Sequence, residues 1–107
     1  KTPNSKIFSK KIAQNINRLS YALDLQQVEA TLEILDCISK LEIKVDIAEA
    51  QSYYFSKIVA NIEYLIGQIA CQADRDLLVM LFEIGEDLNI NMQYYKQMFD
   101  RALVGKA

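Results

Sequence analysis

The chain contains no histidine, and it has only one proline and three glycines among its 107 residues. Without histidine it lacks the commonest general base and the commonest transition-metal ligand, which excludes Ser-His-Asp and Cys-His nucleophile systems. It also lacks the glycine-rich phosphate loops and the Gly-x-Ser-x-Gly elbow. We therefore expect no catalytic residue, no metal site and no cofactor, and we do not expect an enzyme.

The scarcity of glycine and proline argues against a many-stranded β fold, and an apolar content of 51% argues against disorder. The longest apolar run, residues 77–82, is far shorter than the ~20 residues of a bilayer span. These features predict one all-α domain over residues 1–107, soluble and cytoplasmic, with no membrane span. The start at Lys1 rather than Met is typical of a fragment or a processed product.

Two cysteines, Cys37 and Cys71, fall within apolar helical patterns. Cysteines in such surroundings are more often buried free thiols than a disulfide, so we expect both to be buried and free.

Apolar residues spaced three and four apart predict five helices. They cover approximately residues 5–23, 25–41, 46–72, 74–88 and 92–104. The third is the central helix, and its predicted core stripe is Ala48, Phe55, Ile58, Ile62, Leu65 and Ile69. Gln51 interrupts that stripe, and we expect its amide to bond the backbone of an extended link between helices. Asp24 and Asp46 are predicted helix caps.

The sequence also contains a weak internal repeat. The apolar link Leu41, Ile43 and Val45, shifted by 47 residues, falls on a second link that follows another helix, at Leu88, Ile90 and Met92. This period lies near that of HEAT-type arrays, but two units are too few for a solenoid. We therefore predict a compact bundle of about five helices, with two pseudo-repeated αα pairs plus an N-terminal amphipathic helix.

Charge is uneven along the chain. Residues 1–23 carry five basic groups and no acid, while residues 24–107 carry seven basic and fourteen acidic groups, and together they give the net charge of −2. The basic helix, with Lys10, Lys11 and Arg18, either docks on acids of its own domain such as Glu83 and Glu86, which we favour, or faces an acidic partner or membrane surface. Because the whole chain is acidic, we do not expect nucleic-acid binding.

Two tyrosine doublets, Tyr53-Tyr54 and Tyr94-Tyr95, form the other unusual pattern. Adjacent helical residues point about 100° apart, so each doublet should have one buried ring and one at the surface. The rings either cover junctions within the domain, which we favour, or contact a partner. The candidate interaction residues are Tyr53, Tyr54, Tyr94, Tyr95, Lys10, Lys11 and Arg18.

The stretch from Leu41 to Phe55, LEIKVDIAEAQSYYF, resembles helical segments in the C-terminal extension of α-amylase/α-mannosidase-like glycoside hydrolases. In those segments a helix ending in leucine, a short alternating link and an Ala-Gln-aromatic helix recur. The resemblance implies an accessory helical region rather than a catalytic barrel, and no site residue is carried over from it.

The expected function is a non-catalytic accessory or protein–protein interaction module that binds a protein partner or a second copy. The alternative is a sensor that holds a small molecule between the third, fourth and fifth helices.

Overall fold

The described residues of the computed structural model, 3–19, 21 and 23–106, form five helices and no strand. They are α1 (Pro3–Leu19), α2 (Leu25–Lys40), a continuous central helix, α5 (Gln72–Asp87) and α6 (Gln93–Lys106). The central helix consists of α3 (Ala48–Tyr53), the π-helical segment η1 (Tyr54–Val59) and α4 (Ala60–Gly67). The prediction of an all-α bundle of about five helices is confirmed.

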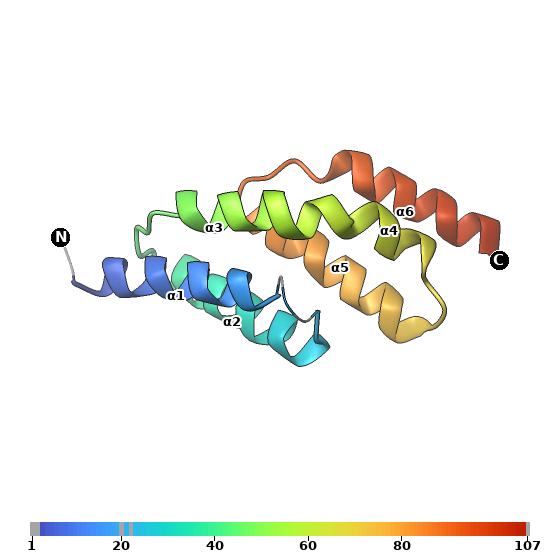
Figure 1. Ribbon diagram of the computed structural model, residues 1–107. Helices are drawn as coiled ribbons and strands as arrows, with labels where there is room; N and C mark the ends of the chain where they lie inside the picture. Colours follow the sequence, from blue (N-terminus) through green and yellow to red (C-terminus); the bar gives the residue numbers. More distant parts are fainter. Residues whose placement is uncertain (1–2, 20, 22, 107) are drawn as a thin grey trace.

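The helices pack in two layers (Figure 1). The first layer contains α1, the central helix and α6, and the second layer contains α2 and α5 behind them. Within the first layer α1 contacts α3, and α4 contacts α6; within the second layer α2 contacts α5. The layers are joined where α1 contacts α2 and α4 contacts α5. The molecule is therefore elongated, 50 × 23 × 22 Å, with its two ends at opposite ends of the array.

The 47-residue repeat is visible in the backbone. Both second-layer helices are sixteen residues long, and they begin 47 residues apart, at Leu25 and Gln72. Because contacts join α1 to α2 and α4 to α5, each repeated unit is a first-layer helix followed by a second-layer helix. α6 is then the first-layer helix of a third unit.

The same helix ending closes both units. After α2, the amide of Ile43 donates to the carbonyl of Ile38 at 3.1 Å, and 47 residues later the amide of Ile90 donates to Gly85 at 2.8 Å. Such a bond across five residues needs a left-handed residue just before it. Glu42 and its counterpart Asn89 supply that residue, with φ of 53° and 62°.

The link residues behave as predicted. Ile43 and Val45 are half-buried against the core. The Gln51 amide donates to the carbonyl of Leu88 at 2.6 Å, which confirms its expected bond to a link. The Asp24 carboxylate accepts from the amide of Gln26, which confirms it as the cap of α2. Asp46 accepts from the amide of Ala48, but the cap position of α3 is Ile47, so the predicted cap lies one residue too early.

The central helix is not a regular α-helix, and this overturns part of its predicted stripe. Buried residues recur every four positions along it, at Ala50, Tyr54, Ile58, Ile62 and Ile66, and Val59 is buried beside this stripe. In an α-helix a four-residue step advances 40° beyond a full turn, so such a stripe would wind off the core. The wider turn of η1 offsets part of that drift.

The prediction that Phe55 and Ala48 belong to the core is therefore wrong. Phe55 is 64% exposed and Ala48 is also at the surface. The buried aromatic residue is the preceding one, Tyr54.

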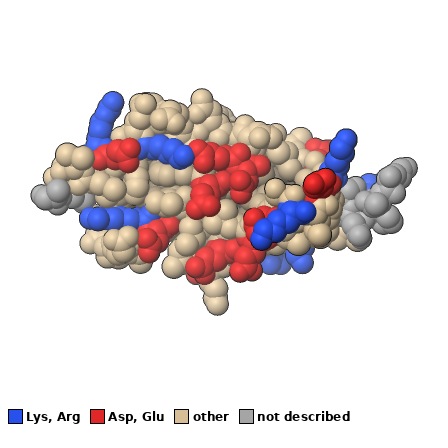
Figure 2. All heavy atoms as spheres, turned by 180° about the vertical axis from the view of Figure 1, so that it is seen from behind, with Lys and Arg blue, Asp and Glu red and all other residues tan. Residues whose placement is uncertain are grey.

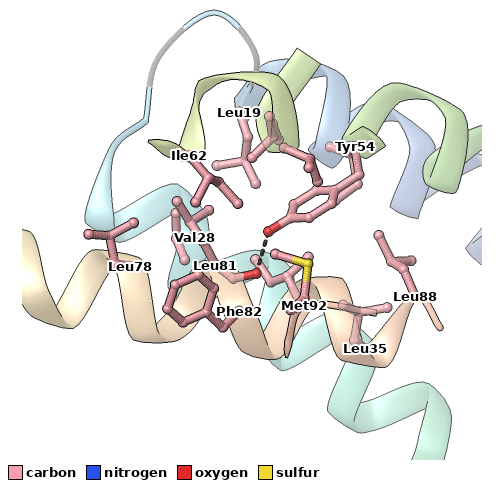
Figure 3. Close-up of a cluster of buried hydrophobic side chains, with 14 of the residues drawn as sticks. Leu19, Val28, Leu35, Tyr54, Ile62, Leu78, Leu81, Phe82, Leu88 and Met92 are labelled. Atoms are coloured by element: carbon pink, nitrogen blue, oxygen red, sulfur yellow. Dashed lines mark hydrogen bonds between the residues drawn. The ribbon is translucent and has the colours of Figure 1, made fainter. Parts of the chain in front are cut away.

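Tyr54 lies in the centre of the core, with no exposed surface, among residues of several helices (Figure 3). Its hydroxyl donates to the carbonyl of Leu81 in α5, and burial raises the pKa of the phenol. Tyr54 therefore joins the two layers and is not available to a partner, so its prediction as an interaction residue is wrong.

Several boundaries also differ from the prediction. α1 ends at Leu19 rather than near Ala22 or Leu23, of which Ala22 is outside the described residues. The turn after the central helix lies at 68–71, not at 72–74. Asp74 lies in the first turn of α5, where its carboxylate accepts from the amides of Ala70 and Cys71, and these bonds lower its pKa.

The cysteines are free, but both are exposed. The prediction that they are buried is wrong, because Cys71 lies in the turn before α5 and Cys37 lies on the outer side of α2.

Candidate interaction surface

A groove runs between α1 and α2, and we call it the α1–α2 groove. Its lining comes from both helices: Ile7, Lys10, Lys11, Gln14, Asn15, Arg18, Gln27, Ala30 and Ile34. The apolar stripe of α1 faces inward, with Ile12, Ile16 and Leu19 buried in the core. The opposite side of α1 therefore forms the wall of an open surface groove.

The rim of the α1–α2 groove is basic. Lys10, Lys11 and Arg18 are exposed, and no carboxylate is among the lining residues. Among the described residues no ion pair involves these three cations, since the two recorded pairs join Lys40 to Asp36 and Lys96 to Glu86. The favoured prediction that this basic helix docks on its own domain through charge is wrong, because α1 docks by its apolar stripe.

The floor of the groove is polar and fixed by hydrogen bonds. Asn15 of α1 is only 7% exposed. Its side-chain amide donates to the carbonyl of Lys11 at 2.8 Å, and its oxygen accepts from the Gln27 side chain at 2.6 Å. Gln27 thereby joins α2 to α1. The groove is therefore held in one shape before any partner arrives.

On the other side of α1, Tyr53 lines a second shallow groove with Lys10 and Gln14. The Lys57 ammonium lies 5.5 Å from the Tyr53 ring centre and 5.6 Å from that of Tyr21, which is 79% exposed. These distances are typical of cation–π contacts. The Tyr53 hydroxyl donates to Glu49 at 3.2 Å, and this bond raises the pKa of Tyr53.

The chain matches none of the protein-family models, curated proteins or solved structures compared with it.

The structure thus brings four of the seven predicted residues together, Lys10, Lys11, Arg18 and Tyr53, around α1. The second doublet lies far from them on α6, where Tyr94 is 61% exposed and packs edge-to-face on the half-buried Tyr95, with ring centres 5.1 Å apart.

Sequence reasoning missed Lys57 and Tyr21 as neighbours of Tyr53. Lys57 could have been found, because it follows Tyr53 by one helical turn. Tyr21 could not, since its position depends on how α1 packs on η1.

Two further classes of site are absent from the described part of the chain. None of its helices combines the length and apolar character of a membrane span. It also holds no group of three or more His, Cys, Asp or Glu side chains placed to bind a metal ion.

The second-layer face carries a contrasting acidic surface. Figure 2, seen from that side, shows carboxylates gathered near the middle of the molecule. Asp87 is the last residue of α5. Its pKa is raised first by partial burial and then by repulsion from Glu83, Glu86 and Asp36. The negative end of the α5 dipole lies in the same place.

We expect Asp87→Asn to stabilise the protein at pH 7. A carboxyl whose pKa is higher in the folded state destabilises that state once ionised, and the penalty disappears below its unfolded pKa. Because Asp87 is largely solvated, Tm should rise by only roughly 1–4 °C at pH 7 and by nothing below about pH 4. Thermal melts from pH 3 to 8 check this, with Glu63→Gln on the exposed side of α4 as the control. A gain from Asp87→Asn that persists at pH 3 would contradict the assignment.

Proposed function

We propose that this chain is a non-catalytic helical interaction module that binds an acidic segment of a protein partner in the α1–α2 groove. The observation that carries the proposal is the set of three exposed cations, Lys10, Lys11 and Arg18, on one groove without a described carboxylate opposite them. In a chain of net charge −2 this local positive field attracts an acidic ligand and orients it.

The other lining residues indicate what the partner segment contains. Ile7 is 60% exposed and Ile34 is half-buried, so the groove offers aliphatic contacts beside its cations. The fixed pair of Asn15 and Gln27 offers polar contacts at the floor. An acidic segment with one or two aliphatic side chains complements all three features.

The accessory role is what the resemblance of residues 41–55 to helical extensions of glycoside hydrolases implies, and no matching family model or curated protein adds to it. The small-molecule alternative has less support, because the side chains between α5 and the start of α6 pack closely and leave only a surface groove outside them. A methyl group added at Gly85 would lie 2.6 Å from the Met92 sulfur, and Phe82 contacts Phe99 edge-to-face.

The test is a charge reversal with a matched control. The probe is a fluorescein-labelled sixteen-residue peptide in which leucine recurs every four positions among glutamates. We expect Lys10→Glu/Lys11→Glu/Arg18→Glu to weaken its binding at least about tenfold, since it replaces three attractions worth ~0.2–1 kcal/mol each with repulsions of similar size. The control reverses Lys40, Lys44 and Arg101, which are also exposed but lie elsewhere.

Fluorescence anisotropy at low and moderate salt measures the affinity, and circular dichroism confirms that both variants fold. Binding should weaken with salt, because the contacts are ionic. Equal losses in the two triple variants, or no binding by the wild-type chain at low salt, would sink the proposal.

A further inference from the structure

The alternation of layers is incomplete at α6. Along the chain the helices alternate between the first layer and the second layer. In the first layer α1 is covered by α2, and the central helix is covered by α5. No described helix covers α6 in this way. A second groove, the α5–α6 groove, lies between α5 and α6 where a third second-layer helix would sit.

The first repeat shows how such a position is filled. Shifted by 47 residues, Leu32, Leu35 and Asp36 of α2 fall on Val79, Phe82 and Glu83 of α5. In the first copy α5 packs beside these α2 residues: Leu35 is buried, and Asp36 lies close enough to Asp87 of α5 to raise its pKa. In the second copy the same face of α5 is open, and Val79 is 45% exposed.

The chemistry of the α5–α6 groove selects its ligand. Val79, Phe82 and Phe99 form an apolar floor, in which the two rings meet edge-to-face with centres 5.5 Å apart. Three carboxylates lie among its lining residues: Glu83, Glu86 and Asp100. One cation, Lys96, also lines the groove, and it is paired with Glu86. The floor therefore fits an aliphatic helix stripe, and the rim fits basic residues beside that stripe.

We propose that the α5–α6 groove binds a lysine- or arginine-rich amphipathic helix of a partner protein, seated as a third second-layer helix. The bound helix lies alongside α5 and runs in the same direction, as α5 does alongside α2 (Figure 1). This inference does not rest on the α1–α2 groove, which is at the other end of the molecule and has the opposite charge.

A second copy of the chain is a poorer occupant. Its most basic helix is α1, whose aliphatic stripe of Ile12, Ile16 and Leu19 is buried within its own core. Only Ile7 remains as a large exposed aliphatic side chain on α1. A helix already packed in this way cannot present basic residues and an aliphatic stripe together.

The test uses a labelled sixteen-residue peptide with leucines spaced three and four apart and lysine elsewhere, and the intact chain. Two variants alter the groove at exposed positions: Val79→Glu places a charge in the floor, and Glu83→Lys/Asp100→Lys reverses the rim. The matched control, Glu29→Lys/Glu33→Lys, makes the same charge change on exposed residues of α2. We expect each groove variant to weaken binding at least about tenfold and the control less than about threefold.

Two companion peptides separate this site from simple charge attraction. Replacing the leucines by serine, or the lysines by glutamate, should abolish binding to the wild-type chain. The proposal is overturned if the serine peptide binds as tightly as the leucine peptide, or if the control variant loses as much affinity as the groove variants. It is also overturned if sedimentation velocity shows a dimer that Val79→Glu converts to a monomer, because a second copy would then occupy the groove.

Discussion

Replacing Tyr54 with alanine should lower the free energy of unfolding by about 3–5 kcal/mol, the usual cost of truncating a buried aromatic ring. The side chain has no exposed surface and lies between the two layers, so the cavity would open in the centre of the core (Figure 3). The same change at the adjacent Phe55, which is 64% exposed, should alter stability by no more than ~0.5 kcal/mol. Because a domain of this kind has a total stability of about 5–15 kcal/mol, the difference is large.

Urea denaturation followed by circular dichroism measures both variants, and Tyr54→Phe completes the series. That third variant keeps the ring and removes only the hydroxyl that donates to Leu81, so about 1 kcal/mol should be lost. If Phe55→Ala proves more costly than Tyr54→Ala, the register of the central helix is not the one described.

Deleting Glu83 from α5 should abolish cooperative folding, whereas deleting Ser56 from η1 should leave the chain folded. Both residues are exposed, so neither deletion removes a core side chain. In α5 the deletion rotates all later residues by about 100° about the helix axis. Ile84 and Leu88 then leave the buried face of α5, which begins at Leu78. Both are fully buried, and the core cannot be rebuilt without them.

The deletion in η1 should have the opposite effect on folding. A π-helical segment holds more residues per turn than an α-helix, so removing one residue allows the segment to return to α geometry. The buried positions after Ser56 would then follow Tyr54 at intervals of three and four, as an α-helical stripe requires. Thermal melts and amide chemical-shift dispersion compare the two deletions, and a Ser56 deletion as unfolded as the Glu83 deletion would argue against this account of η1.

Much of the fold was predictable because it depends on local patterns. The five helices follow from apolar spacing, the Asp24 cap from its position before α2, and the Gln51 bond from the need of a buried amide for a partner. Phe55 was assigned to the core, and the buried ring of the Tyr53-Tyr54 doublet was not identified, because a helical wheel assumes one constant period. Nothing in the residue types marks where the π turn begins.

The helix boundaries were predicted wrongly for a related reason. The turn at 68–71 contains neither glycine nor proline, and the left-handed positions are occupied by Glu42 and Asn89, so the usual end signals are missing. The exposure of Cys37 and Cys71 also depends on which side of each helix meets a neighbour.

The candidate surface was predictable in part. Lys10, Lys11 and Arg18 could be placed on one side of α1 from their spacing alone. Whether that side met the acids of α5 or solvent depended on packing, because α1 packs chiefly on α2 and α3. The pairing of Asn15 with Gln27 was equally hidden, since it joins two helices whose relative register is set by their apolar contacts.

The layered arrangement has a consequence for how stability is distributed along the chain. The main contacts of α1 are with α2 and α3, and α6 is held chiefly by α4, with the ring of Phe99 against that of Phe82 in α5. In a linear array of this kind the end element can open without unfolding the rest. The backbone of α6 is thus the segment whose amides become accessible first, while the Tyr54 junction opens only with global unfolding. A ligand seated on the open side of α6 would therefore slow the local opening of α6. Its binding would have to order only that one helix of the chain.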